Sequence, residues 1–223
     1  GGSENHIRDL SRALVRLGAR VSVVHNSALA TVDDNFVEEG VEITIRAIFG
    51  NRQRENSKSF FQEFLRKGKP LISNRWMATQ LSSLGCDLFH QHDLISNYLT
   101  SRLLVRTGKP VLLTNHLGEY LLMRKYLPDF VVRPIFAPYD HIIGPSSELN
   151  PQDLHNNCSV LWNGFDDRTF NLDPIARKKV RAELDVESDE TLVLVPRRWA
   201  PTKGVLHAAT SARQLKNQKK IKW

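Results

Sequence analysis

The sequence predicts an α/β fold in which a Rossmann-like parallel sheet is covered by helices on both faces. Short apolar runs such as Val111–Thr114 and His141–Gly144 alternate with amphipathic stretches along the 223-residue chain. Strands that alternate with helices in this way are typical of a parallel sheet with helices on both sides. The composition agrees, because 41% hydrophobic and 25% charged residues are near the average of globular domains.

The first part of the chain begins with a helix. Ile7, Leu10 and Leu14 recur at helical spacing, and Gly18 ends the helix. The patterns that follow predict strands at Val21–Val24 and Val41–Ile48, an exposed loop at Asn51–Ser59, a helix with an apolar stripe from Phe60 to Leu65, a helix at Asn74–Leu84 and a short strand at Leu88–His90.

The second part continues the alternation. The patterns predict a helix at Asn97–Arg106, strands at Val111–Thr114, His141–Gly144, Val160–Trp162 and Thr191–Val195, helices at Glu119–Tyr126 and Pro174–Leu184, a short helix after Pro145-Ser146-Ser147, and a helix from Val205 to Leu215. Asp173 is the expected N-cap of the helix that opens at Pro174, because Asp favours the cap and Pro the first helical position.

A basic loop, V-P-R-R-W-A-P-T-K-G at Val195–Gly204, follows the predicted strand at Thr191–Val195. It places Arg198 and Lys203 outside the carboxyl end of a strand, where α/β sheets bind ligands, and just before a helix. Two cations beside a helix N-terminus are suited to a phosphate or diphosphate. The alternative is an ordinary solvated basic loop.

The chain opens on Gly1-Gly2 directly before the first predicted helix. Glycines there let a ligand approach the backbone closely, with helix amides facing it. A plain turn is the alternative. The full dinucleotide fingerprint G-x-G-x-x-G is absent, which disfavours a nicotinamide-type site.

Histidines lie after two predicted strands. His116 follows Val111–Thr114, where it could donate a hydrogen bond to a hydroxyl or a phosphate oxygen of a ligand near neutral pH. Capping of the next helix is the alternative role. His90, His92 and Asp93 suggest a metal, but the spacing supplies no convincing third ligand, so no metal site is predicted.

Two further residues, beside Gly1 and His92, are candidates for lining a ligand-binding cleft at the carboxyl ends of the strands. Ser146 could place a hydroxyl in the cleft, although capping of a short helix is the favoured role. Asn163 begins an Asn-Gly pair after the strand at Val160–Trp162, and this pair favours a tight turn.

The formal net charge of +7 suits an anionic partner. Nucleic acid is not the expected partner, because basic residues are not interleaved with aromatic residues on one face. No apolar stretch approaches the roughly 20 residues that cross a bilayer. Two cysteines, Cys86 and Cys158, make neither a disulfide framework nor a metal motif, and free thiols are consistent with a reducing compartment.

Several motifs, in order, carry a family resemblance. They are G-G-S-E-N-H-I-R-D-L at the start, D-L-F-H-Q-H at Asp87–His92, V-L-L-T-N-H at Val111–His116, D-H-I-I-G-P-S-S at Asp140–Ser147, V-L-W-N-G-F-D-D-R-T-F at Val160–Phe170 and R-W-A-P-T-K-G. Together they resemble retaining glycosyltransferases of the family-4 type. The resemblance implies a GT-B fold, in which two Rossmann-like domains face each other across a cleft. It implies that His116 matches the family's active-site histidine, and that Arg198 and Lys203 match its donor-phosphate loop.

The resemblance also sets the expected domain organisation. Residues 1–172 form the acceptor-side domain without its first strand, and residues 173–223 begin a truncated nucleotide-sugar-binding domain. Two complete domains of roughly 150 residues or more would need a longer chain. The family's pair of glutamates on a later helix has no counterpart here. The chain is therefore interpreted as a fragment of a hexosyltransferase-type enzyme, inactive alone.

The expected substrates are a nucleotide-diphosphate sugar donor and a glycan, lipid or small-molecule acceptor, with no cofactor and no metal. The expected location is the cytoplasm, at the inner face of the membrane if the basic, Phe-containing stretch Asn51–Lys69 touches anionic lipid. A half-buried helix with a solvated face explains this stretch equally well. Three alternatives remain open: an epimerase on the same fold, a phosphorylase-like enzyme, and a non-catalytic module that binds a sugar nucleotide or a partner.

Overall fold

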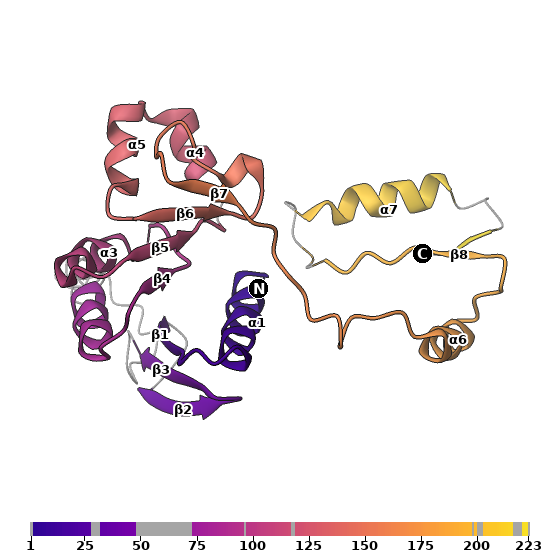
Figure 1. Cartoon of the computed structure of the whole chain (residues 1–223). Helices are drawn as coiled ribbons and strands as arrows, with labels where there is room; N and C mark the ends of the chain where they lie inside the picture. Colours follow the sequence, from indigo (N-terminus) through magenta and orange to yellow (C-terminus); the bar gives the residue numbers. More distant parts are fainter. Residues whose placement is uncertain are drawn as a thin grey trace, which may run out of the picture. The chain divides into compact units, whose positions relative to one another are not determined.

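The computed structural model describes residues 2–27, 32–47, 73–95, 97–116, 119–197, 199, 203–215 and 220–222. The chain divides into two compact units, Gly1–Asp166 and Asp167–Trp223 (Figure 1). The predicted loop at Asn51–Ser59 and the predicted helix from Phe60 to Leu65 lie outside the described residues. Among the helices that the structure describes, none combines the length and apolar character needed to cross a membrane.

The first unit contains a four-stranded sheet whose strands follow one another in chain order. Its strands are β4 (Phe89–Gln91), β5 (Val111–Thr114), β6 (His141–Gly144) and β7 (Cys158–Val160), in the order β4-β5-β6-β7. All three pairings are parallel, with registers Gln91↔Leu113, Leu113↔Ile142 and Ile143↔Ser159. Because the strands are parallel, their carboxyl ends lie along one edge of the sheet.

A second sheet in this unit contains three strands. β1 (Ser22–Ser27) pairs parallel with β3 (Val41–Ala47), and β2 (Asp34–Glu38) pairs antiparallel with β3. The sequence predicted β1 and β3 but not β2, and it predicted only parallel strands. All five residues of β2 are exposed, so it lacks the apolar alternation by which a half-buried strand is recognised.

Helices connect the strands. They are α1 (Gly2–Arg16), a helix over residues 73–83, α3 (Tyr98–Leu104), α4 (Glu119–Tyr126) and α5 (Asp129–Phe136), with 3-10 turns at η1 (Val105–Thr107) and η2 (Ser147–Leu149). The predicted helices around these segments are present, but α5 was not predicted. Pro134 lies inside α5, and a proline within a pattern normally argues against a helix interior.

The core of the unit is formed by β5, β6 and α5. Val111, Leu113 and Ile142 are completely buried, as are Val132 and Phe136 of α5. The Phe136 ring contacts Tyr120 of α4 edge-on, with ring centroids 5.6 Å apart. This packing holds α4 and α5 against the sheet, and it fixes the strands whose ends carry the candidate site.

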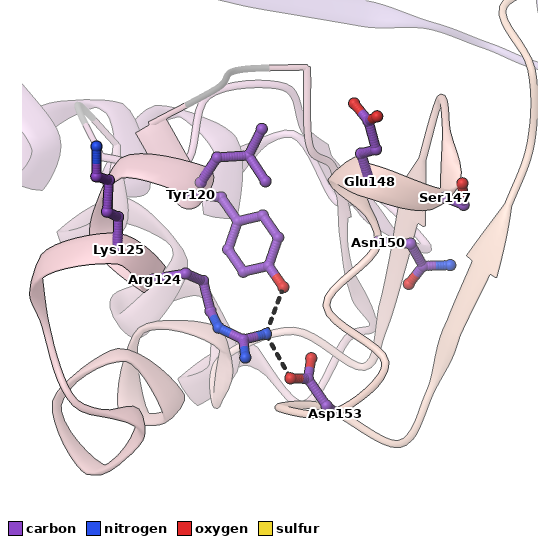
Figure 2. Close-up of a pocket in the computed structure, with 8 residues that line it drawn as sticks. Tyr120, Arg124, Lys125, Ser147, Glu148, Asn150 and Asp153 are labelled. Atoms are coloured by element: carbon purple, nitrogen blue, oxygen red, sulfur yellow. Dashed lines mark hydrogen bonds and ion pairs between the residues drawn. The ribbon is translucent and has the colours of Figure 1, made fainter.

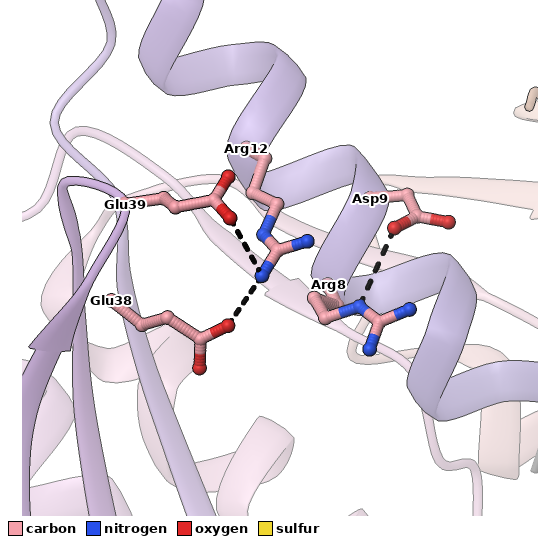
Figure 3. Close-up of polar contacts among 5 residues, drawn as sticks. All are labelled: Arg8, Asp9, Arg12, Glu38 and Glu39. Atoms are coloured by element: carbon pink, nitrogen blue, oxygen red, sulfur yellow. Dashed lines mark hydrogen bonds and ion pairs between the residues drawn. The ribbon is translucent and has the colours of Figure 1, made fainter. Parts of the chain in front are cut away.

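Helix α1 is tied to the turn between β2 and β3. Arg12 pairs with Glu38 and, at 3.0 Å, with Glu39, while Arg8 contacts Asp9 on the helix itself (Figure 3). In that turn Gly40 has φ +81°, and a Cβ there would lie 2.9 Å from Cγ1 of Val15. The close approach explains why glycine is required, and it sets the position of α1 beside β3.

The second unit contains α6 (Pro174–Glu183), β8 (Thr191–Leu192), α7 (Val205–Gln214) and β9 (Ile221–Lys222), with β8 and β9 parallel. The predicted strand at Thr191–Val195 is thus wrong in length. The predicted strand at Val160–Trp162 is also displaced, because β7 ends at Val160. Leu194 and Trp162 are 78% and 76% exposed. These runs looked like buried strands because they are apolar, but pairing with a neighbouring strand decides where a strand ends.

Helix α6 begins as predicted, with Pro174 in its first turn and Asp173 as its N-cap. The Asp173 carboxylate accepts hydrogen bonds from the Ile175 and Ala176 amides, both at 2.9 Å. Replacing Asp173 with alanine should lower the free energy of unfolding of this unit by about 1 kcal/mol, because two helix amides lose their acceptor. Chemical denaturation would measure the loss. Glu183→Ala at the other end of α6 is the control and should change the free energy of unfolding by only a few tenths of 1 kcal/mol.

Candidate functional site

The carboxyl edge of the β4-β5-β6-β7 sheet carries four of the residues that the sequence nominated. His92 follows β4, His116 comes two residues after β5, Ser146 follows β6, and Asn163 comes three residues after β7. The strands are parallel neighbours, so these positions succeed one another along a single edge. Such an edge is where open α/β sheets bind ligands.

His92 and His116 are in direct contact at this edge. Nδ1 of His92 lies 3.1 Å from Nε2 of His116, and the two rings stack with centroids 5.3 Å apart at an interplanar angle of 16°. The position of His116 is fixed by its neighbour Asn115, whose amide donates to the Ile143 carbonyl at 2.9 Å. Nδ2 of Asn115 also donates to the Leu149 carbonyl at 2.8 Å.

Two more histidines complete a cluster with His92 and His116. His6, in the second turn of α1, contacts the His116 ring edge-on at 4.8 Å and the His92 ring at 5.8 Å between centroids. The His90 ring lies 4.2 Å from that of His92, and its Nε2 is 2.7 Å from Oγ1 of Thr114. His90 and His92 share a face because β4 continues through Gln91. We call these four residues the histidine cluster.

The end of β4 is held from the opposite side of the strand. Gln91 donates from Nε2 to the Tyr139 hydroxyl at 3.2 Å, and the buried Ser101 hydroxyl donates to the same oxygen at 3.2 Å. Ser101 also contacts Gln91, and Gln91 contacts the Asp93 carbonyl. Burial raises the pKa of Tyr139 above its ordinary value. This network fixes the backbone from which His90 and His92 project.

The histidine cluster favours neutral rings. Burial, with smaller repulsion from neighbouring histidines, lowers the pKa of His90 and of His116 to about 4 from 6.5. The same causes lower the pKa of His92 to about 2, and burial lowers the pKa of His6. At neutral pH each ring therefore has one N–H donor and one acceptor nitrogen, and one ring of the His92–His116 pair donates to the other. Such rings can hydrogen-bond to hydroxyl or phosphate oxygens or bind a metal ion.

A hollow of about 490 Å³ lies near the segments that follow β5 and β6. It is lined by Tyr120, Leu121, Arg124, Lys125, Ser147, Glu148, Asn150 and Asp153. Figure 2 shows Arg124 between the Tyr120 hydroxyl, at 3.2 Å, and the Asp153 carboxylate. Asn150 is only 7% exposed, yet neither atom of its side-chain amide has a hydrogen-bond partner among the described residues. The hollow is therefore lined by polar and charged side chains, while the Asn150 amide beside it is buried.

Ser146 and Asn163 show no such contacts. Ser146 occupies the N-cap position of η2, but its side chain makes no capping hydrogen bond, so the capping role favoured from the sequence is wrong in this respect. Asn163 is exposed and lies in the irregular segment after β7. Both residues lie at the carboxyl edge of the sheet, and neither side chain has a hydrogen-bond partner among the described residues.

The phosphate candidates lie in both units. Gly2 opens α1 in the first unit and is exposed, and a Cβ added to it would meet nothing within 4 Å. Lys203 lies in the second unit and is exposed, directly before Gly204, which takes φ +70° at the start of α7. Gly1 and Arg198 lie outside the described residues. Binding of one diphosphate by Gly2 of the first unit together with Arg198 and Lys203 of the second unit remains a prediction.

The sequence did not lead us to name His6 as a candidate site residue. A signal was present, because His6 stands one helical turn after Gly2, and Gly2 was expected to face a ligand at this edge. Only the packing of α1 beside β3 shows that His6 reaches two residues more than 80 positions away.

Comparison with solved structures supports the fold. The chain is similar to a structure of Anabaena Alr3699/HepE in complex with UDP and glucose, with a TM-score of 0.58, 13% identity, and coverage of 100% of this chain and 65% of that one. A structure of the same Anabaena protein in complex with UDP gives a TM-score of 0.44 at 13% identity, covering 65% of this chain and 50% of that one. The chain thus spans less than two thirds of the length of either structure. The predicted GT-B type of α/β fold is confirmed.

Comparison with families gives the membership. Among curated proteins, no relative matches the sequence. The family model described as Glycosyltransferase Family 4 matches residues 1–168, which is well over half of the chain and includes the whole histidine cluster. The chain therefore belongs to Glycosyltransferase Family 4.

Proposed function

We propose that this chain is part of an enzyme that transfers a sugar, with retention of configuration, from a nucleotide-diphosphate donor to an acceptor. The observation that carries the proposal is the contact between His92 and His116 at the carboxyl edge of the sheet, within the segment that matches the family. His116 is the proposed catalytic residue. A neutral ring there can donate a hydrogen bond to a donor-sugar hydroxyl or a phosphate oxygen, while His92 orients it.

The charge on the leaving diphosphate would be neutralised by cations and amides. In the proposal, Lys203 and Arg198 contribute two positive charges, and the amide of Gly2 at the start of α1 faces the same group. Fixed charges lower the barrier because negative charge grows on the leaving oxygen in the transition state. The diphosphate therefore needs no divalent metal for its departure.

The acceptor is assigned to the first unit. The polar hollow beside α4 and η2 has the volume of a small-molecule site, and the charged side chains that line it, such as Lys125 and Glu148, can bond to hydroxyl groups. A glycan, a lipid headgroup or a small polyol shares that chemistry.

The enzyme would work in the cytoplasm, and contact with the membrane would involve the stretch Asn51–Lys69.

Calorimetry with nucleoside diphosphates and a product assay with several nucleotide sugars test this function. The full-length gene product should bind UDP or another nucleoside diphosphate. With a nucleotide sugar as substrate, it should release the nucleoside diphosphate only when the sugar appears on an acceptor. Tight binding without transfer would instead indicate a binding module. An altered sugar still attached to the nucleotide would indicate an epimerase. Sugar phosphate formed from inorganic phosphate would indicate a phosphorylase-like enzyme.

A further inference from the structure

Three members of the histidine cluster come from segments that are far apart in the sequence and meet at one point. His6 comes from α1, His92 from the end of β4 and His116 from beyond β5. One ring nitrogen of each lies within 4.8 Å of the corresponding nitrogens of the other two. All three side chains are half-buried, so the point between them is reachable from solvent but shielded by protein. From this geometry we propose that His6, His92 and His116 bind a divalent transition-metal ion of the Zn²⁺ type.

The distances suit such an ion. A zinc–nitrogen bond of about 2.0–2.1 Å at a tetrahedral angle places two ligand nitrogens about 3.3 Å apart. Nδ1 of His92 and Nε2 of His116 are 3.1 Å apart, so this pair already has the required separation. His6 needs to approach by at most about 1.5 Å to complete the set.

The chemistry of the ligands selects the ion. Imidazole binds Zn²⁺, Co²⁺, Ni²⁺ and Cu²⁺, whereas Mg²⁺ and Ca²⁺ prefer oxygen ligands. Three neutral ligands leave the full charge on the ion and a fourth position open for water or another oxygen ligand, as in zinc sites with three histidines.

The site was not predicted from the sequence because His90, His92 and Asp93 do not make a convincing ligand set by their spacing. The fold supplies both missing ligands, His6 and His116. The ion and the proposed transfer role of His116 use the same ring, so the two states exclude one another. Metal binding is nevertheless independent of the proposed function, because it requires neither a nucleotide nor an acceptor.

The test uses the chain without a polyhistidine tag, stripped of metal with a chelator that is then removed. Titration with Co²⁺ should produce visible absorption bands typical of four-coordinate cobalt at one ion per chain. Zn²⁺ should displace the Co²⁺ with a dissociation constant of about 1 μM or lower, and Mg²⁺ should not. His6→Gln and His92→Gln should each weaken Co²⁺ binding by about 100-fold or more.

His207→Gln is the matched control, because His207 is exposed on α7 in the other unit. Its binding should equal that of the original chain. Circular dichroism identifies a variant that fails to fold. If His92→Gln does not fold, His6→Gln still tests the proposal, because His6 is only half-buried on helix α1. Zn²⁺ should also raise the melting temperature of the original chain but not of His6→Gln. The proposal is overturned if Co²⁺ gives no bands at one equivalent, if His6→Gln binds as tightly as His207→Gln, or if Mg²⁺ competes equally.

Discussion

Lys203→Ala in the full-length gene product should lower kcat by about 100- to 1,000-fold, the loss that follows removal of one preorganised group from a developing negative charge. Lys203 stands exposed just before α7, where the family resemblance places the donor diphosphate. If its ammonium contacts the leaving group only as charge grows, the loss appears in kcat and kcat/KM together. Steady-state kinetics with a saturating acceptor would measure both.

Two variants separate this role from a general effect of charge. Lys203→Arg keeps the positive charge and should retain much of the activity. Lys220→Ala removes an exposed lysine of the same unit, which pairs with Asp189 at 3.1 Å, and should leave the rate unchanged. Near-normal turnover by Lys203→Ala would show that Lys203 does not stabilise the leaving diphosphate. An equal loss in Lys220→Ala would show that net charge, and not this position, matters.

The first unit should lose about 3 kcal/mol of stability when the pH falls from 7.5 to 5.5, measured with a chelator present. The pKa of His90 is about 4 and that of His92 about 2 in the folded chain, against 6.5 when unfolded. The unfolded chain therefore binds more protons, so the free energy of unfolding rises with pH in this window. The contribution of these two histidines to the free energy of unfolding is complete above pH 6.5. It falls as the pH drops toward the folded-state pKa values, about 4 for His90 and about 2 for His92.

The size follows from the proton balance. At pH 5.5 a histidine that stays neutral when folded costs about 1.4 kcal/mol, so His90 and His92 together account for about 3 kcal/mol. His116 adds less than its shift suggests, because solvent reaches about half of it. Against a typical total of about 5–15 kcal/mol, this loss is large.

Denaturant unfolding followed at several pH values would measure it. Glutamine cannot gain the proton, so the double variant His90→Gln, His92→Gln should lose most of the dependence on pH. His207→Gln should keep the original slope. A free energy of unfolding that stays constant from pH 7.5 to 5.5, or a double variant with the original slope, would contradict the burial of neutral rings in the histidine cluster.

Much of the fold was determined by local pattern. β5, β6 and α4 occur at the predicted residues, and α6 starts with the predicted cap, because apolar runs, glycines and capping residues act over a few neighbouring positions. The family membership was also readable, since its motifs are linear. These features depend on the residues next to each other in the chain.

Other features depended on contacts across the chain. β2 forms because β3 provides a pairing edge, and β8 is short because, in the part of the chain that the structure describes, its register with β9 covers Thr191 and Leu192. The sequence placed His92 and His116 at strand ends, but the contact between their rings follows from the parallel register of β4 and β5. His6 joins them only because α1 packs beside β3. The sequence by itself determined which strand ends carry chemistry, whereas the tertiary structure decided which side chains meet, because spatial distance between segments is set by packing and pairing.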